Sequence, residues 1–232
     1  MPNLTVGDVA SLPDARLLFE DGAAALEGVS TDTREKDFRK KLYIALRGDR
    51  TDGHEYLPQA ADQGAACALI EHRGIGRARA LHAAGKLPSA VAVPDTLKAL
   101  GELARRHRAK LHVKIIAITG SNGKTSTKDF TAAILSTTYE TVKAPLSFNN
   151  SIGVPLTILK MTSATQVGVL EMGMNHPGEI AALCEIADPD APRDGELIIR
   201  TGRPDPDVAA REDKLVRSRD QAVGREVQSP RH

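Results

Sequence analysis

The chain has 232 residues, and 41% of them are hydrophobic, which is enough for one large core or two small ones and excludes a wholly disordered protein. Its 31 Lys and Arg residues nearly balance its 30 Asp and Glu residues, so no overall field draws it to nucleic acid or to an anionic membrane surface. Only 3% of the residues are aromatic and Trp is absent, which removes the stacking platforms that hold single-stranded nucleic acid.

The expected compartment follows from the cysteines and from the absence of long apolar runs. Cys67 and Cys184 lie far apart in apolar surroundings, which predicts reduced core residues rather than a disulfide. No basic patch followed by an apolar stretch opens the chain, and no apolar run approaches the roughly 20 residues that span a bilayer. We therefore expect a soluble, cytoplasmic protein that does not insert into membranes.

Residues 1–94 alternate between strand-like and helix-like segments, which predicts a small α/β domain. Apolar residues at period two predict a half-buried strand over 42–46. A helix is expected over 55–63, with Gly64 as its stop. Short apolar runs predict buried strands over 66–70 and 91–93.

A longer helix is predicted to begin at Asp95, a suitable N-cap residue, and it marks the expected domain boundary. Its apolar stripe comprises Leu97, Leu100, Leu103 and Ala104. Three arginines near its end, Arg105, Arg106 and Arg108, complement the negative pole of the helix. We interpret them as a solvated helix terminus rather than as a nucleic-acid patch.

Residues 95–190 continue as a second α/β domain. Strands are predicted over 115–118 and 167–172, and a helix over 124–136. Another helix is predicted after Pro177, and Pro189 stops it. The order strand, helix, strand is typical of a parallel sheet with right-handed crossovers.

Residues 191–232 differ in character, because they are rich in Arg, Asp and Pro and contain a single short apolar cluster over 197–199. Such a segment buries too little apolar area to offset the entropy of ordering. We predict that it is disordered.

The strongest chemical signal is a glycine-rich loop between the strand at 115–118 and the helix at 124–136. It reads Thr119-Gly120-Ser121-Asn122-Gly123-Lys124-Thr125. Glycines let backbone N–H groups converge on a phosphate at the positive end of a helix, while Lys124 reaches the terminal phosphates and Thr125 can ligate Mg²⁺. The general pattern requires glycine where Ile118 stands, so this phosphate-binding loop is a variant form.

Two further sites could serve the loop. Glu171 ends an apolar strand, and ligands collect at the carboxyl ends of parallel strands, so we expect its carboxylate near the loop as a Mg²⁺ ligand; the alternative is an ordinary surface residue. Asn149 and Asn150 could bind nucleotide or substrate through their amides, or could serve only to form a turn. His176 and Glu179 flank Pro177 at a helix start, where a capping role is expected.

The chain resembles the Mur ligase family of cell-wall amino-acid ligases. Three strings carry the resemblance: ITGSNGKTSTKDFTAAIL (118–135), FNNSIGVPLTIL (148–159) and LEMGMNHPGEIAALCEIADPD (170–190). The last is most like the branch that adds D-alanyl-D-alanine to UDP-N-acetylmuramoyl-tripeptide, and residues 30–57 resemble the N-terminal UDP-substrate domain of that branch. Residue Ile118 is no longer a departure, because the family loop has the form T-G-S/T-x-G-K-T.

The resemblance implies a reaction, its cofactors and its residues. ATP phosphorylates the tripeptide carboxylate, the amine of D-Ala-D-Ala attacks the acyl phosphate, and phosphate leaves. It implies ATP and Mg²⁺ as cofactors, those two cell-wall precursors as substrates, and a monomer. By position, the catalytic residues are Lys124 and Glu171, and the metal ligands are Thr125 and Glu171. The nucleotide residues are Gly120, Ser121, Asn122, Gly123, Lys124, Thr125, Ser126, Asn149 and Asn150. Candidates for the uridine pocket are Thr33, Arg34, Gly48, Asp52 and His54.

The resemblance ends near residue 190. Family members are roughly twice as long, and APRDGELIIRTGRPDPD (191–207) replaces the strand expected there. We hypothesise a truncated or frame-shifted product with a non-native tail and an incomplete ATPase domain, catalytically incomplete by itself. The alternatives are a non-catalytic fragment that binds UDP-muramyl-peptide or nucleotide, another Mur-type ligase, or an unrelated phosphate-loop kinase or ATPase.

Overall fold

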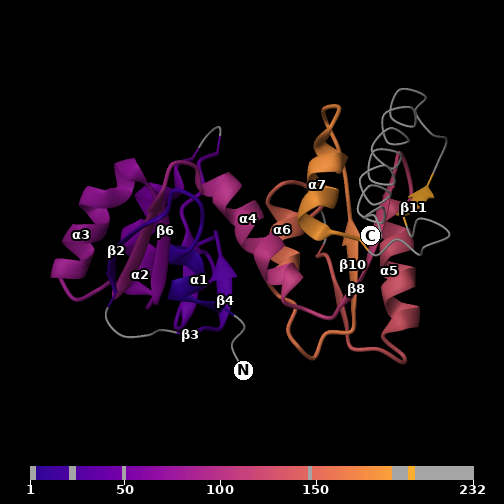
Figure 1. Cartoon of the computed structure of the whole chain (residues 1–232), viewed down its shortest axis with the longest axis horizontal. Helices are drawn as coiled ribbons and strands as arrows, with labels where there is room; N and C mark the ends of the chain where they lie inside the picture. Colours follow the sequence, from indigo (N-terminus) through magenta and orange to yellow (C-terminus); the bar gives the residue numbers. More distant parts are fainter. Residues whose placement is uncertain (1–3, 21–24, 49–50, 146–147, 190–197, 202–232) are drawn as a thin grey trace, which may run out of the picture.

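The computed structural model of the chain describes residues 4–20, 25–48, 51–145, 148–189 and 198–201, the last of these by their backbone. In this part of the chain the two larger of three sheets lie on either side of the helices at 96–109 and 153–158, as Figure 1 shows; the third sheet has two strands. The first unit contains β1 (Leu4–Thr5), α1 (Val6–Ala10), β2 (Arg16–Glu20), β3 (Ala25–Leu26), β4 (Gly28–Ser30), β5 (Lys41–Ile44), η1 (Gly53–Tyr56), α2 (Leu57–Asp62), β6 (Cys67–Glu71), η2 (His72–Gly74), α3 (Ile75–Ala83) and β7 (Ser89–Val93). The second follows with α4 (Thr96–Ala109), β8 (Lys114–Gly120), α5 (Lys124–Leu135), β9 (Thr141–Lys143), α6 (Gly153–Ile158), β10 (Val167–Glu171), α7 (Glu179–Ala187) and β11 (Ile198–Thr201).

The first sheet has the order β2-β7-β6-β5-β4, with β2 antiparallel and the other strands parallel. The strands predicted over 42–46, 66–70 and 91–93 are confirmed, and a 3-10 turn and α2 fill the range predicted as a helix over 55–63. The expectation of a half-buried strand was wrong, because Leu42 and Ile44 pack in one core while Tyr43 packs in another. Helices cover both faces of a parallel sheet, so both faces of β5 are apolar.

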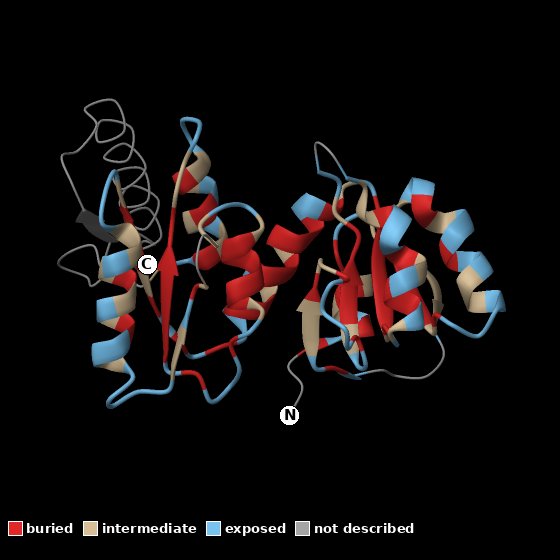
Figure 2. Cartoon of the chain, turned by 180° about the vertical axis from the view of Figure 1, so that it is seen from behind, coloured by how far each residue is buried: buried red, intermediate tan, exposed pale blue. Residues whose placement is uncertain are grey.

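Helix α4 begins as predicted, because the Asp95 carboxylate accepts the backbone N–H groups of Leu97 and Lys98. Three residues of the predicted apolar stripe, Leu100, Leu103 and Ala104, are buried. Leu97, in the first turn, is instead 39% exposed. The buried stripe packs against β5, β6 and β7 on one side and against α6 and α7 on the other, so α4 joins the two sheets; Figure 2 shows it as largely buried.

The arginines at the end of α4 correct the prediction of a solvated terminus. Arg105 is exposed and pairs with Glu102 as expected. Arg108, however, is buried and donates to the carbonyl oxygens of Leu111, Ala187 and Asp188. The carboxyl end of α7 leaves carbonyls without partners inside the helix, and the Arg108 guanidinium supplies donors for them.

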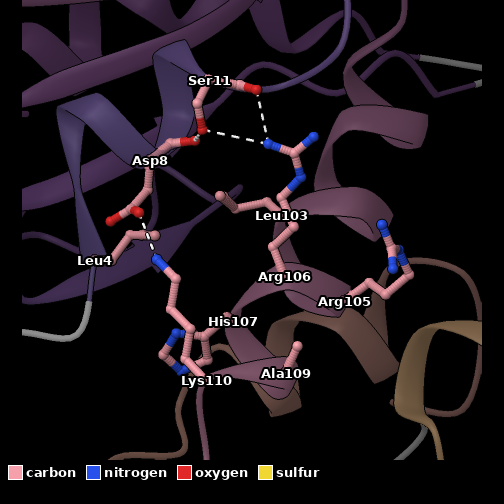
Figure 3. Close-up of a pocket in the computed structure, with 9 residues that line it drawn as sticks. All are labelled: Leu4, Asp8, Ser11, Leu103, Arg105, Arg106, His107, Ala109 and Lys110. Carbon is pink, nitrogen blue, oxygen red and sulfur yellow. Dashed lines mark hydrogen bonds and ion pairs between the residues drawn. The ribbon is translucent and has the colours of Figure 1, made fainter.

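A cavity of about 350 Å³ lies beside the last turns of α4, against α1 (Figure 3). Lys110 reaches across it to Asp8 at 2.5 Å, and Arg106 donates to the main-chain and side-chain oxygens of Ser11. Arg105 and Arg106 both pair with Glu102. The charged side chains around this cavity pair with protein groups, and the contacts of Lys110 and Arg106 join α4 to α1.

His107 ties α4 to the segment after α6. Its Nε2–H donates to the carbonyl of Met161 at 2.9 Å, and its buried Nδ1 has no hydrogen-bond partner in the part of the chain that the structure describes. Burial lowers the pKa of His107, and the Lys110 ammonium lowers it further.

This arrangement predicts a loss of stability in mild acid. The unfolded chain takes up a proton near pH 6.5, whereas the buried imidazole does so only at lower pH. The contribution of His107 is therefore complete above about pH 6.5 and declines below it, by at most about 1.4 kcal/mol per pH unit. Urea unfolding at pH 8, 6.5 and 5.5 should show a smaller decline for His107→Gln than for the unsubstituted chain; parallel declines would contradict this role.

The second sheet has the order β11-β8-β10-β9, and its strands are all parallel. Helix α5 covers one face, while α4, α6 and α7 cover the other (Figure 1). The predicted strands and helices of residues 95–190 are confirmed, with α5 ending at Leu135 and α7 ending at Ala187, before Pro189. This confirms a parallel-sheet α/β fold.

Strand β11 contradicts part of the predicted disorder of residues 191–232. Residues 198–201 pair in parallel with β8, from Ile198 beside Ala117 to Thr201 beside Gly120. Residues 198–201 pair with the N–H and C=O groups of β8 on the side away from β10, which would otherwise be an edge of the sheet. The rest of the predicted tail, 191–197 and 202–232, lies outside the described residues.

Two further predictions concern the cysteines and the membrane. Cys67 is buried and Cys184 partly buried, and the two are not joined by a disulfide, as predicted. Burial raises the pKa of the Cys67 thiol to about 12, so it is unreactive. Within the described ranges, none of the helices has the length and hydrophobicity to cross a bilayer.

Candidate functional site

The glycine-rich loop leaves the sheet between β8 and α5. Gly120 has φ of 134° and Gly123 has φ of 76°, and residues other than glycine rarely adopt such backbone angles. Gly123 is the N-cap residue of α5, so the loop leads directly into the positive end of a twelve-residue helix. The Lys124 ammonium donates to the carbonyl of Gly120 at 2.7 Å, which closes the loop on itself.

Glu171 lies beside this loop, as predicted. Strand β10 pairs with β8 so that Glu171 is level with Ile118, two residues before Gly120. The side chain is only 3% exposed. Its Oε2 accepts the Thr125 hydroxyl at 2.9 Å, and its Oε1 accepts the Asn149 amide at 3.0 Å. Three segments distant in sequence therefore meet at one buried carboxylate.

The two asparagines have different surroundings. The Asn149 side chain bonds to Glu171, and its carbonyl accepts the N–H of Gly173. The Asn150 carboxamide oxygen instead accepts the N–H groups of Ile152 and Gly153 at the start of α6, which is turn chemistry. The structure thus brings Asn149 to the carboxylate and leaves Asn150 as a local cap.

The remaining loop residues are open to solvent. Ser121, Asn122, Gly123 and Ser126 are exposed, while Thr125 is half-buried. No cluster of three or more His, Cys, Asp or Glu side chains suited to a metal occurs among the described residues. The oxygen donors that the structure does bring together are the Thr125 hydroxyl and the Glu171 carboxylate.

Lys128 was missed by sequence reasoning. It lies one turn after Lys124 on α5 and is only 1% exposed. Its Nζ is 3.9 Å from Glu171 Oε2 and 3.7 Å from Asp129 Oδ1. The signal was available: Lys128, Ala132 and Leu135 share the apolar face of α5, and a lysine on such a face requires a partner.

The five uridine-pocket candidates do not form one cluster. Thr33 is buried and bonds to Gln59 on α2, while Arg34 is exposed and pairs with Asp32. The Gly48 N–H donates to the carbonyl of Thr51. Asp52 and His54 do lie together, at the carboxyl end of β5.

The His54 imidazole is committed to the fold. Its Nε2 accepts the N–H of Glu71 at 2.8 Å, so the proton is on Nδ1, which donates to Asp52 at 2.7 Å. Arg73 links Asp52 to Glu71. Thr33, Arg34 and Asp52 nevertheless follow adjacent parallel strands, at the edge of the sheet that faces the same side of the molecule as the glycine-rich loop (Figure 1).

The capping role expected of His176 and Glu179 at the start of α7 is wrong, because the N-cap residue is Gly178 and no side chain caps the helix. The Glu179 carboxylate accepts the N–H groups of Asn175 and His176, and these bonds lower the pKa of Glu179.

A parallel sheet that feeds a glycine-rich loop into a helix, with an acidic residue at the end of the neighbouring strand, defines the phosphate-loop class of α/β proteins. Two models of one family match the chain: the Mur ligase middle domain at residues 118–192, and the catalytic domain of the Mur ligase family at residues 25–108. The chain belongs to the Mur ligase family.

Relatives in sequence are named UDP-N-acetylmuramoyl-tripeptide--D-alanyl-D-alanine ligase. The one from Bacillus subtilis is 43% identical over 166 residues, which is 72% of this chain and 35% of that protein. The one from Haemophilus influenzae is 37% identical over 195 residues, covering 82% of this chain and 40% of that protein. The chain therefore spans about two fifths or less of these relatives.

Solved structures give the same result. MurF from Acinetobacter baumannii superposes with a TM-score of 0.65 at 28% identity, over 82% of this chain and 40% of that one. MurF from Thermotoga maritima in complex with ADP superposes with a TM-score of 0.58 at 29% identity, over 71% of this chain and 36% of that one.

Proposed function

We propose that this chain carries the nucleotide-binding portions of an ATP-dependent ligase that joins D-alanyl-D-alanine to UDP-N-acetylmuramoyl-tripeptide in the cytoplasm. The names of the relatives at 43% and 37% identity support the substrates. The observation on which the proposal rests is the buried contact of Thr125 and Asn149 with Glu171, directly beside a glycine-rich loop at a helix N-terminus.

In this proposal residues 120–126 bind the ATP phosphates through backbone N–H groups. Lys124 exchanges the Gly120 carbonyl for the terminal phosphoryl group, and its charge offsets the charge that develops there during transfer to the tripeptide carboxylate. The amine of D-Ala-D-Ala then attacks the acyl phosphate and phosphate leaves. The ADP complex of the Thermotoga maritima relative supports nucleotide use.

The donor set fits Mg²⁺. Neighbouring oxygen ligands of octahedral Mg²⁺, each about 2.0–2.1 Å from the ion, are about 2.9 Å apart. The Thr125 and Glu171 oxygens are 2.9 Å apart, so both could ligate one cation once the hydroxyl, which keeps its proton, turns that proton away from the carboxylate. When bound, the metal would supply positive charge to the phosphates. Asn149 keeps Glu171 oriented from its other oxygen.

We assign residues 1–94 to UDP-substrate binding and residues 95–190 to ATP binding, in a monomer. The carboxyl edges of the two parallel sheets open on the same side of the molecule, which allows one extended substrate to reach both (Figure 1). Thr33, Arg34, Gly48 and Asp52 remain candidates for the uridine nucleotide, while His54 acts through Asp52.

Calorimetric titrations test this function. We expect Mg·ADP and UDP-N-acetylmuramoyl-tripeptide each to bind once, without competing, and UMP to compete only with the second. Release of phosphate that needs both ATP and D-Ala-D-Ala would establish ligation, whereas binding without release would identify a binding module. Competition of Mg·ADP and UDP-tripeptide for one site, or failure of both to bind, would contradict the proposal.

A further inference from the structure

Lys128 is a buried cation in a position where an apolar side chain would suit the fold. It is 1% exposed, on the face of α5 that packs against the sheet with Ala132 and Leu135. Removing an ammonium from water costs several kcal/mol unless another charge compensates it. A structural reason alone does not account for lysine here, because leucine or methionine would fill the same space without that cost.

Two carboxylates lie within ion-pair distance of Lys128. Asp129 is 42% exposed, and Lys143 already binds it at 2.7 Å. Glu171 is almost as buried as Lys128, and its Oε2 lies 3.9 Å from the ammonium. Charges interact most strongly where solvent is excluded, so Glu171 is the partner that accounts for the buried lysine.

The position of the ammonium has a consequence for the metal. Glu171 Oε2 is the oxygen that also accepts the Thr125 hydroxyl, and these are the two oxygens proposed to hold the cation. A divalent cation placed there faces the positive charge of Lys128 a few ångströms away. Nucleotide phosphates add several negative charges to the same place and offset both cations.

Resting on the proposed function, we propose that Lys128 is a positioning residue that holds the Glu171 carboxylate and weakens the binding of a free divalent cation. The metal is then captured together with the nucleotide phosphates rather than ahead of them. Lys124 and Lys128 lie one turn apart on α5 and have different roles. Lys124 contacts the phosphate, and Lys128 places a positive charge beside the carboxylate that binds the metal.

The test measures Mn²⁺ binding directly, from the electron paramagnetic resonance signal of free Mn²⁺, with and without ADP. Lys128→Met keeps the length of the side chain and removes its charge. We expect it to bind Mn²⁺ alone about tenfold more tightly than the unsubstituted chain does, with a smaller change when ADP is present. Lys143→Met, which removes the exposed cation that binds the same Asp129 oxygen, should leave both affinities unchanged.

The outcomes separate the two proposals. Failure of the unsubstituted chain to bind Mn·ADP would contradict the proposed function itself. Normal Mn·ADP binding, with an affinity of Lys128→Met for free Mn²⁺ that is unchanged or weaker, would overturn the role of Lys128 alone. Circular dichroism checks that the variant is folded; if it is not, Lys128→Gln, which is uncharged but keeps a polar end, is measured against the same expectation.

Discussion

Replacing Lys124 with alanine is expected to weaken ADP binding roughly 10- to 100-fold, because a charge-assisted hydrogen bond to phosphate contributes roughly 1.5–3 kcal/mol. Lys124 bonds to the carbonyl of Gly120 at the carboxyl end of β8, where both residues are half-buried and water can take the place of the ammonium. The variant should therefore keep its thermal stability while it loses affinity, as calorimetry and a melting curve can establish.

Lys98→Ala is the matched control, since that lysine is 87% exposed on α4 and only 3.9 Å from Asp95. It should bind ADP as the unsubstituted chain does. Equal ADP affinity in Lys124→Ala and Lys98→Ala would mean that the loop does not bind the terminal phosphates of the nucleotide.

Replacing Arg108 with methionine is expected to lower the free energy of unfolding by about 3 kcal/mol. The methionine fills much of the space but leaves the carbonyls of Leu111, Ala187 and Asp188 without the guanidinium donors. Each buried polar group that loses its partner costs about 1–3 kcal/mol, and the relaxation of the α7 end recovers a part. Urea unfolding measures the difference.

Arg105→Met, three residues earlier on the same helix, provides the comparison. Its side chain is 52% exposed and pairs, within the part of the chain that the structure describes, with Glu102 alone, so a loss of about 0.5 kcal/mol or less is expected. If the two variants unfold at the same urea concentration, Arg108 does not join α4 to α7 in the way that its contacts indicate.

The sequence predicts about half of the described elements, namely those whose causes are local. Asp95 caps α4 through two backbone N–H groups that follow it, and Pro189 lies just beyond the end of α7. The burial of Arg108 could not be predicted in the same way. Two of its three acceptors, the carbonyls of Ala187 and Asp188, lie about eighty residues further along the chain, and only the packing of α7 on α4 brings them near.

In the candidate site, too, the features with local causes could be predicted and those that depend on contacts between distant segments could not. The glycine-rich loop and Glu171 follow from a motif and from the rule that parallel strands present their carboxyl ends together. Asn149 and Asn150 have different roles because the Asn149 amide turns toward Glu171 on β10 and the Asn150 amide does not. The packing of distant segments decides this, so the local sequence does not predict it. His54 fits a ligand role by sequence, yet its two ring nitrogens are occupied by Asp52 and by the N–H of Glu71.

Strand β11 is the second strand that pairs with β8, the strand that leads into the glycine-rich loop. With β10 on one side and residues 198–201 on the other, β8 is an interior strand, and the backbone of Gly120 is level with Thr201 just where the chain turns into the loop. The match to the family model ends at residue 192, so β11 lies outside the matched residues. The loop at 119–125, which lies inside the family match, is therefore supported by a strand that lies outside it.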